Sequence, residues 1–134
     1  MKPDDPSIAG EVWILRALPF EGWYKFDGST VRATSLAFVD NRSGEVSCYL
    51  DSPASRSELT KKFPGCFLAR FTAAQARSSG FNVTGDPVDE PCGEDHVVLT
   101  FKGAAIRKEL QKAAKALSLL CETIYSLSAQ TKVD

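Results

Sequence analysis

The sequence of 134 residues lacks the groupings that mark most metal sites and catalytic centres. It has one histidine, and no Cys-x-x-Cys pair occurs among its four cysteines, which are Cys48, Cys66, Cys92 and Cys121. Structural zinc sites usually take their ligands from such closely spaced pairs. We therefore expect no metal, no cofactor and no catalytic residue set. We interpret the cysteines as free thiols of a cytoplasmic protein, because disulfide frameworks belong mainly to secreted chains.

The sequence also has little excess of charge and no long apolar run. Sixteen Lys and Arg residues against 17 Asp and Glu residues give a net charge of −1. No strong field therefore draws the whole molecule to nucleic acid or to an anionic membrane. No apolar segment approaches the ~20 residues that span a bilayer, and the first residues lack the pattern of a signal peptide. We expect neither a membrane nor nucleic acid as a partner of the chain as a whole.

The composition is that of an ordinary globular domain, with 43% hydrophobic and 25% charged residues. A chain of this length buries roughly two-thirds of its unfolded surface around one core. We predict a flexible N-terminal tail at residues 1–10, a single domain at residues 11–128 and a frayed C-terminus at residues 129–134.

Short segments rich in β-forming residues predict five or six strands. The Asp27-Gly28 pair between two apolar segments predicts a hairpin with a type I′ turn. Residues 40–44 predict a second hairpin, which joins a strand at 36–39 to a strand in which alternation buries Cys48. The remaining predicted strands are EVWILRAL at 11–18, CFLARF at 66–71, FNVT at 81–84 and HVVLTF at 96–101.

Capping patterns predict two short helices. Ser55 has an acid three residues later, the spacing of a capping box, and begins a helix of about two turns that ends at a Pro-Gly pair. Thr72 with Gln75 repeats this spacing before a helix at residues 73–79, which Gly80 ends. A bulged strand is the alternative for residues 73–79.

A regular apolar stripe predicts one long helix from residue 104 to about residue 128. Its apolar positions are spaced four and three residues apart; they are Ile106, Leu110, Ala113, Leu117, Leu120, Ile124 and Leu127. Hairpins first, short helices next and a long helix last predict an α+β fold. We expect an antiparallel or mixed sheet of about five to six short strands, with the long C-terminal helix packed on it and one or two short helices.

Several motifs between about residues 35 and 115 resemble those of a group of short uncharacterised bacterial proteins. They are Ser35-x-Ala37-Phe38, the EVSCYL strand, Ala73-x-x-x-Arg77-x-x-Gly80, and Asp86-Pro87 followed by Pro91, His96 and an apolar strand. The sequence departs from the group at PCGEDHV, residues 91–97, which is longer than the Pro-x-His-Ala stretch that those proteins tend to have. The resemblance implies a small cytoplasmic bacterial domain and no particular reaction.

The acidic loop at residues 86–95 forms the first candidate site, because it leads directly to His96. Our main interpretation is a turn-rich loop, with His96 at the first position of a strand, where its ring bonds a backbone group. The alternatives are a metal site with Cys92, Glu94 and Asp95, and a nucleophilic pair of Cys92 and His96. Adjacent strand residues point to opposite faces, and nearby acids oppose formation of a thiolate, so we do not favour either alternative.

A basic cluster after this strand forms the second candidate site. It consists of Lys102, Arg107, Lys108, Lys112 and Lys115. Cations at the start of a helix oppose its dipole, which favours an anionic ligand or an acidic partner surface. A solvated helix face is the simpler interpretation. A cleft that held His96 beside Arg77 or Arg107 would favour phosphate binding or acid–base catalysis.

Two apolar groups predict interaction surfaces. Trp23 and Tyr24 belong to the aromatic-rich FEGWYKF segment, and aromatic residues are enriched at interface hot spots. Leu120, Ile124 and Leu127 lie toward the end of the predicted long helix, through which a homodimer would form. Burial in the core is the alternative interpretation for both groups.

These observations lead to two functional hypotheses. The main hypothesis is a small non-enzymatic binding or accessory module that acts through contacts with a protein, either a second copy or another chain. The alternative is a phosphate-binding, nucleic-acid-binding or enzymatic domain, which would use the basic helix start together with His96.

Overall fold

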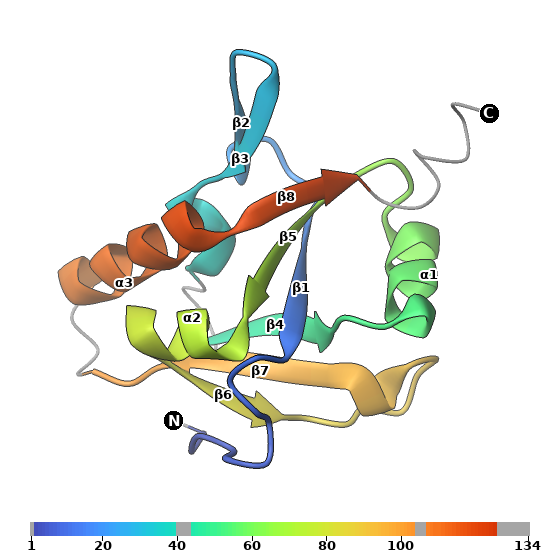
Figure 1. Ribbon diagram of the computed structural model, residues 1–134, viewed down its shortest axis with the longest axis vertical. Coiled ribbons are helices and arrows are strands. Elements are labelled where there is room, and N and C mark those ends of the chain that lie inside the picture. The colour runs from blue at the N-terminus through green and yellow to red at the C-terminus, as the bar shows by residue number, and fades with distance from the viewer. Residues whose placement is uncertain (1, 40–43, 104–106, 126–134) are drawn as a thin grey trace.

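The computed structural model describes residues 2–39, 44–103 and 107–125, and it confirms the predicted α+β fold (Figure 1). The strands are β1 (Trp13–Leu18), β2 (Tyr24–Asp27), β3 (Thr30–Ala33), β4 (Glu45–Leu50), β5 (Phe67–Thr72), β6 (Phe81–Gly85), β7 (His96–Phe101) and β8 (Glu122–Tyr125). The helices are α1 (Pro53–Lys62), α2 (Ala73–Ser79) and α3 (Arg107–Leu120), with short 3-10 helices at Ser35–Phe38 and Gly93–Asp95. No helix within the described ranges has both the length and the apolar character needed to cross a bilayer.

Six strands form one antiparallel sheet in the order β6-β7-β4-β1-β5-β8, and β2 and β3 form a separate hairpin. In the centre of the large sheet, β1 and β4 pair at only two positions, Ile14↔Leu50 and Leu15↔Tyr49. Beyond these positions the two strands diverge. Figure 1 shows β1 and β5 running across the direction of β4 and β7. This divergence positions the site described below.

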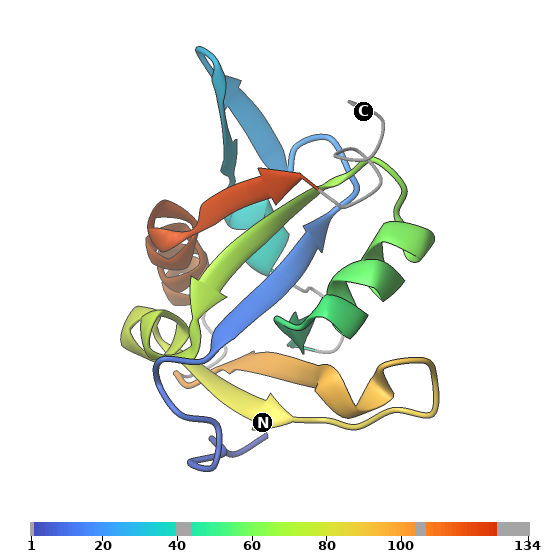
Figure 2. The same cartoon turned by 45° about the vertical axis from the view of Figure 1, so that its right-hand side comes forward.

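The helices cover the two faces of the sheet unequally (Figure 2). The main core lies on the side of α2 and α3, and its largest buried side chains include Phe38, Phe71, Phe81 and Leu117. A smaller core lies under α1 and consists of Leu15, Tyr49, Leu59 and Leu68. Helix α1 has 10 residues and is therefore about 15 Å long, whereas six strands spaced about 4.8 Å apart span about 24 Å. Part of the α1 face is therefore not covered by any helix of the described residues.

The first predicted hairpin is confirmed, although its turn is different. Strand β2 pairs with β3 through Asp27↔Thr30, so the two turn residues are Gly28 and Ser29. Only Gly28, with a φ of 66°, has a positive φ at these two positions. A type I′ turn requires positive φ at both central residues, so the turn is not of this type.

The strand predicted at residues 36–39 is wrong, because Ser35–Phe38 forms a 3-10 helix. The Ala37 amide donates to the Thr34 carbonyl at 3.1 Å, and the Phe38 ring packs edge-on against Phe71 with ring centroids 5.6 Å apart. Burial of this phenyl ring in the main core outweighs the weak local preference for a strand. The remainder of the predicted second hairpin, residues 40–43, lies outside the described residues.

Helix α1 begins earlier than predicted. Its N-cap is Ser52 and not Ser55: the Ser52 side chain accepts a hydrogen bond from the Ser55 amide, and the Ser55 side chain accepts one from the Ser52 amide. Pro53 occupies the first helical turn, where the missing amide hydrogen costs nothing and the fixed φ suits the helix. The second capping box, Thr72 with Gln75, is confirmed at the start of α2, which ends at Gly80.

The C-terminal helix is shorter than predicted, because α3 ends at Leu120 and the chain then forms β8. Strand β8 pairs with β5 through Leu68↔Ile124, which places the Ile124 side chain against the smaller core. The pairing satisfies the backbone groups at the outer edge of β5, which would have no partner there if the chain continued as a helix. The predicted stripe therefore spans a helix and a strand, and Ile106 and Leu127 lie outside the described residues.

The segment before β1, predicted to be a tail, lies along β6 at the other edge of the sheet. The Asp5 amide donates to the Val83 carbonyl at 2.8 Å, and the Val83 amide donates to the Asp4 carboxylate at 2.9 Å. Thr84 Oγ1 donates to the Pro3 carbonyl at 2.5 Å. These bonds cover an edge strand that would otherwise expose its backbone groups.

We expect Ser52→Ala to lower the free energy of unfolding by about 1 kcal/mol, because it removes the N-cap bond of α1 and the 2.8 Å hydrogen bond to Asp95. Urea denaturation followed by circular dichroism measures the change. Ser57→Ala is the matched control, since Ser57 lies exposed on the same helix. Equal stability of the two variants would contradict the assignment of Ser52 as the cap.

Candidate functional site

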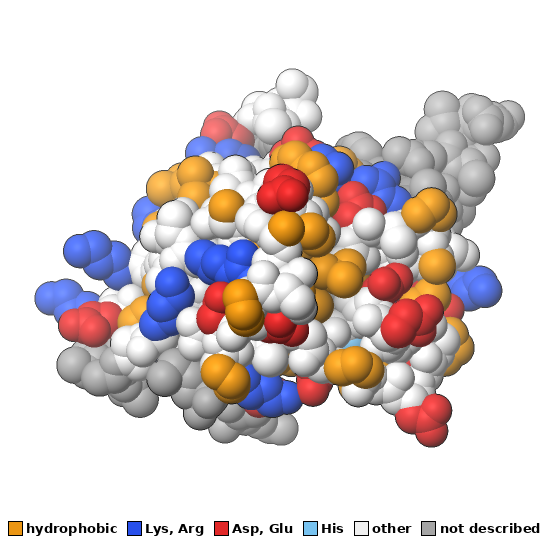
Figure 3. Space-filling model, turned by 60° about the horizontal axis from the view of Figure 1, so that its bottom comes forward, with side chains coloured by type: hydrophobic (Ala, Val, Ile, Leu, Met, Phe, Trp, Pro, Cys, Tyr) orange, Lys and Arg blue, Asp and Glu red, His pale blue; other side chains and the backbone are white. Residues whose placement is uncertain are grey.

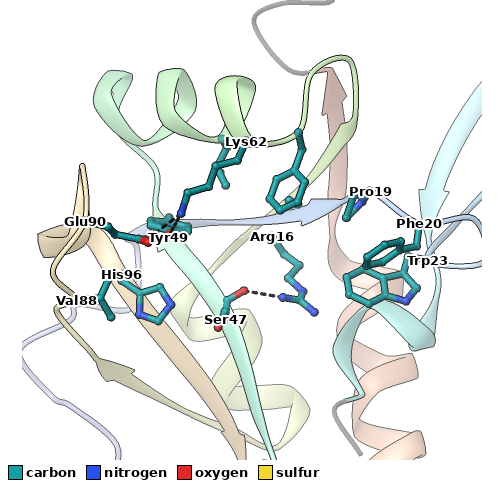
Figure 4. A pocket seen from close by; sticks show the side chains of 13 residues that line it. Arg16, Pro19, Phe20, Trp23, Ser47, Tyr49, Lys62, Val88, Glu90 and His96 are labelled. Atoms are coloured by element: carbon teal, nitrogen blue, oxygen red, sulfur yellow. Dashed lines mark hydrogen bonds and ion pairs between the residues drawn. The ribbon is translucent and has the colours of Figure 1, made fainter.

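A cavity of about 510 Å³ lies on the α1 face where β1 and β4 diverge (Figure 4). Side chains from α1, β1, β4, β7, the segment after β1 and the acidic loop line this His96 cavity; they are Arg16, Ala17, Pro19, Phe20, Trp23, Ser47, Tyr49, Leu59, Lys62, Phe63, Val88, Glu90 and His96. Ligand sites of small molecules typically have this size and mix many apolar groups with a few polar ones.

Arg16 bridges the two diverging strands. Its Nη1 donates to the Ser47 carbonyl of β4 at 2.8 Å, and its Nε donates to the Ala37 carbonyl at 3.0 Å. The guanidinium group also lies 4.6 Å from the centre of the Trp23 ring. Its planar group donates in several directions at once, so it joins β1, β4 and the 3-10 helix where the backbone ladder is interrupted.

The walls of the His96 cavity are largely aromatic. Phe20 and Trp23 pack edge to face with ring centroids 5.0 Å apart, and Phe20 remains 58% exposed at the rim. On the opposite side the ring of Tyr49 lies 5.2 Å from that of His96, also edge to face. Figure 4 shows these two pairs facing each other across the cavity. A planar ligand between them would contact aromatic rings on both sides.

The ring of His96 is held in one orientation. Its Nδ1 lies 2.8 Å from the carbonyl oxygen of Asp86 and 3.2 Å from that residue's carboxylate. Because a carbonyl oxygen only accepts, Nδ1 carries the hydrogen and neutral His96 has its acceptor at Nε2. Among the described residues, no side chain or backbone group bonds Nε2. Every buried side-chain nitrogen or oxygen of these residues has a partner, so the unbonded Nε2 is not buried and opens to the cavity. Of the sequence interpretations, the structure supports a strand-initial His96 that bonds a backbone group.

A second polar group, made of Tyr49, Lys62 and Glu90, lies at the same end of the cavity. The Tyr49 hydroxyl donates to the Glu90 carboxylate, and Lys62 Nζ lies 2.9 Å from that carboxylate and 3.1 Å from the Tyr49 oxygen. The bonds from Tyr49 and Lys62 lower the pKa of Glu90, and burial raises the pKa of Tyr49. At neutral pH the cluster therefore holds a phenol and an ammonium–carboxylate pair.

A close approach of the backbone positions the acidic loop at the cavity. The Val88 amide donates to the Gly93 carbonyl at 3.1 Å. A Cβ atom at position 93 would lie 1.7 Å from the Val88 carbonyl oxygen, so only glycine fits there. This contact folds the loop so that Val88 and Glu90 reach the cavity.

The predicted junction of His96 with the basic residues does not form, because the strand separates them. His96 begins β7 and Lys102 follows its end, which places them about 20 Å apart at 3.3 Å per residue. Figure 3 shows several Lys and Arg side chains projecting at the left edge of the molecule and several Asp and Glu side chains toward the right, with side chains of both signs between them. Lys102 Nζ donates to the Arg77 carbonyl at 3.0 Å, and the Arg77 guanidinium binds Asp4 and the Asp5 carbonyl. Arg77 therefore anchors the N-terminal segment.

The basic residues of α3 fall into two groups. Arg107 and Lys115 line a second hollow, which shares Trp23 with the His96 cavity. Lys108 and Lys112 are exposed on the same helix and do not line this hollow.

The predicted interface residues occupy different places. Trp23 lines both hollows, whereas Tyr24 packs on Phe67 with ring centroids 5.0 Å apart. Leu120 is 45% exposed at the end of α3, and Ile124 packs against the smaller core. Leu120 and Ile124 do not form one helical face, because Leu120 belongs to α3 and Ile124 to β8.

The cysteines offer no activated thiol. Burial raises the pKa of Cys48 to about 12 and also raises the pKa values of Cys66, Cys92 and Cys121. A thiol needs a lowered pKa to react as a thiolate at neutral pH, so the Cys92 nucleophile considered above is not supported. Within residues 2–39, 44–103 and 107–125, no three His, Cys, Asp or Glu side chains are placed to hold a metal ion.

Several residues of the cavity were not predicted, although the sequence contains signals for some of them. Arg16 is a cation inside the apolar run EVWILRAL, where a charged side chain requires a specific partner. Ser47 and Tyr49 alternate with the buried Cys48 and so share the opposite face of β4. Lys62 and Glu90 gave no local signal, because only the tertiary fold brings α1 and the acidic loop together.

Comparisons of the chain with protein-family models, with curated proteins and with solved structures find no match.

We expect Asp86→Asn to lower the free energy of unfolding at pH 7. The bond from Lys2, and to a smaller extent His96, lowers the pKa of Asp86 in the folded protein. Its stabilising contribution is therefore present above the unfolded value of about 3.9 and is lost as the pH falls through the folded value. Urea denaturation should show the deficit of the variant at pH 7 and its decline toward pH 3.

Asp89→Asn is the control, because Asp89 is an exposed acid of the same loop. A deficit of Asp86→Asn that is the same at pH 7 and pH 3 would contradict this account of the Asp86 carboxylate.

Proposed function

We propose that this protein is a non-enzymatic binding module whose main ligand site is the His96 cavity. The observation that carries the proposal is an aromatic-walled cavity into which one oriented acceptor, His96 Nε2, opens. Burial of apolar surface supplies binding energy, and a few well-placed polar groups select among ligands of similar shape. The ligand is a planar, largely apolar molecule that donates a hydrogen bond from an N–H or O–H group.

The chemistry of the described side chains favours binding over catalysis. Asp86 orients the His96 ring, as acid–base catalysis by a histidine requires. However, all four thiols have raised pKa values, and Tyr49 and Lys62 are both engaged with Glu90. No activated nucleophile is therefore available beside the ring among the described residues, which supports a ligand-binding role.

Contacts with a protein are the second candidate function, favoured by exposed aromatic side chains near the first hairpin. Phe26 is 67% exposed and Phe20 is 58% exposed, and Figure 1 shows β2 and β3 projecting from the body of the molecule. Exposed aromatic groups are typical anchors of protein interfaces. Leu119 and Leu120, both exposed at the end of α3, are the described residues through which a homodimer using this helix would form. This candidate requires no small ligand in the cavity.

We expect indole to bind the cavity several-fold more tightly than N-methylindole, because only indole donates a hydrogen bond, and one such bond contributes about 0.5–1.5 kcal/mol. His96 is the only histidine of the chain, so its ring signals in NMR titrations give both affinities directly. Ser47→Phe should abolish binding, since Ser47 lines the cavity and its backbone carbonyl still binds Arg16.

Ser57→Phe introduces the same ring on the exposed side of α1 and should leave binding unchanged. The cavity is not the ligand site if neither ligand perturbs the His96 signals, or if both ligands bind the Ser47→Phe variant as tightly as the original protein. Protein contacts then become the favoured function.

A further inference from the structure

The His96 ring can gain a proton without losing its orientation. Its Nδ1 lies 2.8 Å from the Asp86 carbonyl oxygen and 3.2 Å from the Asp86 carboxylate. Both oxygens accept hydrogen bonds, and Nδ1 carries a hydrogen in this neutral tautomer and in the imidazolium form alike. Protonation therefore adds a hydrogen only at Nε2, the nitrogen that opens to the cavity, and the contacts with Asp86 remain.

The charges around the ring are balanced. The charged and titratable groups come from the N-terminal segment, β1, β4, α1, the residue after β6 and the acidic loop; they are Lys2, Arg16, Tyr49, Lys62, Asp86, Glu90 and Asp95. Lys2 pairs with Asp86 at 2.8 Å, and Lys62 pairs with Glu90 at 2.9 Å. Three cations and three carboxylates make up this set, apart from the phenol of Tyr49. The set therefore carries no excess of either sign.

The imidazole ring is the group of the cavity that changes charge near neutral pH. The bond from Lys2 lowers the pKa of Asp86, and the same bond raises the pKa of Lys2. The bond to Glu90 raises the pKa of Lys62, and burial raises the pKa of Tyr49. Carboxylates are ordinarily ionised, and arginine is protonated, throughout the range of about pH 5–8 in which histidine titrates. Protonation in this range therefore falls on the ring.

We propose that His96 changes the ligand class of the cavity with pH, from planar molecules that donate a hydrogen bond to planar molecules that accept one. The inference rests on the proposed function, which assigns the donor class to the neutral ring, and it adds the second class. A carbonyl or carboxylate oxygen on a planar ring accepts a hydrogen bond from the imidazolium Nε2. The aromatic walls serve both classes, because the His96 ring does not turn when it is protonated.

Indole, 1-indanone and N-methylindole test this switch by isothermal titration calorimetry, because they share one fused-ring shape. Indole donates a hydrogen bond, 1-indanone accepts one, and N-methylindole does neither. All three are uncharged between about pH 5 and 8, the range of the histidine titration, so a change of affinity comes from the protein. We expect the affinity of indole to fall about fivefold over this range as the pH is lowered, and that of 1-indanone to rise about fivefold, as one hydrogen bond would produce. N-methylindole should bind equally throughout.

The titration of the ring should show the same coupling from the other side. His96 is the only histidine of the chain, so its NMR signals give the midpoint of its titration directly. Saturating indole should move the midpoint to lower pH, because indole binds the neutral ring and competes with the proton. Saturating 1-indanone should move it to higher pH, because this ligand binds the protonated ring.

Asp86→Asn tests the role of the carboxylate beside the ring. The variant retains the backbone carbonyl that orients Nδ1 and removes a negative charge that favours the imidazolium. The exchange between the two ligand classes should therefore shift to lower pH. Asp89→Asn is the matched control, because it removes the same charge from an exposed position of the same loop. Circular dichroism verifies that both variants are folded.

The same pH dependence for all three ligands would overturn the inference and leave the cavity as a ligand site. A midpoint that indole and 1-indanone move in the same direction would also overturn it. Exchange at one common pH in the Asp86→Asn and Asp89→Asn variants would contradict it as well, because the titrating group would then not be the ring beside Asp86. If none of the three ligands perturbs the His96 signals at any pH, the proposed function fails and the inference fails with it.

Discussion

The bridge that Arg16 makes between β1 and β4 is the interaction on which the candidate site depends. Antiparallel neighbours normally bond along their whole length, yet these two central strands pair at only two positions. Past Leu15 the guanidinium group binds the carbonyl of Ser47 on β4 and that of Ala37. Side-chain bonds thus replace part of a backbone ladder, and the sheet remains continuous while its two halves run in different directions.

This divergence combines with a short helix to produce a concave surface. Helix α1 covers only part of its face of the sheet, and no other helix of the described residues covers the rest of this face (Figure 2). The His96 cavity forms there, with aromatic rings on two sides and the ring of His96 fixed by Asp86. On the opposite face α2 and α3 contribute buried residues to the main core. The functional surface therefore follows from unequal coverage of one sheet.

Local patterns in the sequence predicted elements whose determinants are local. The Thr72 capping box, the strand beginning at His96 and the burial of Cys48 all depend on a few neighbouring residues, and all are found. The end of α3 was not predictable in this way, because β8 forms only by pairing with β5 across about 50 residues of chain. The cavity was missed for the same reason, although Arg16 in an apolar strand marked one of its walls.

The central claim is that Asp86 fixes His96 so that an unprotonated Nε2 faces the cavity. Long-range ¹H–¹⁵N NMR correlation of the single histidine at a pH where its ring is neutral measures this directly. The account predicts an Nδ1 signal typical of a protonated nitrogen and an Nε2 signal typical of an acceptor. The opposite tautomer, with the hydrogen on Nε2, would contradict it, because the cavity would then present a donor and would select ligands of the reverse polarity.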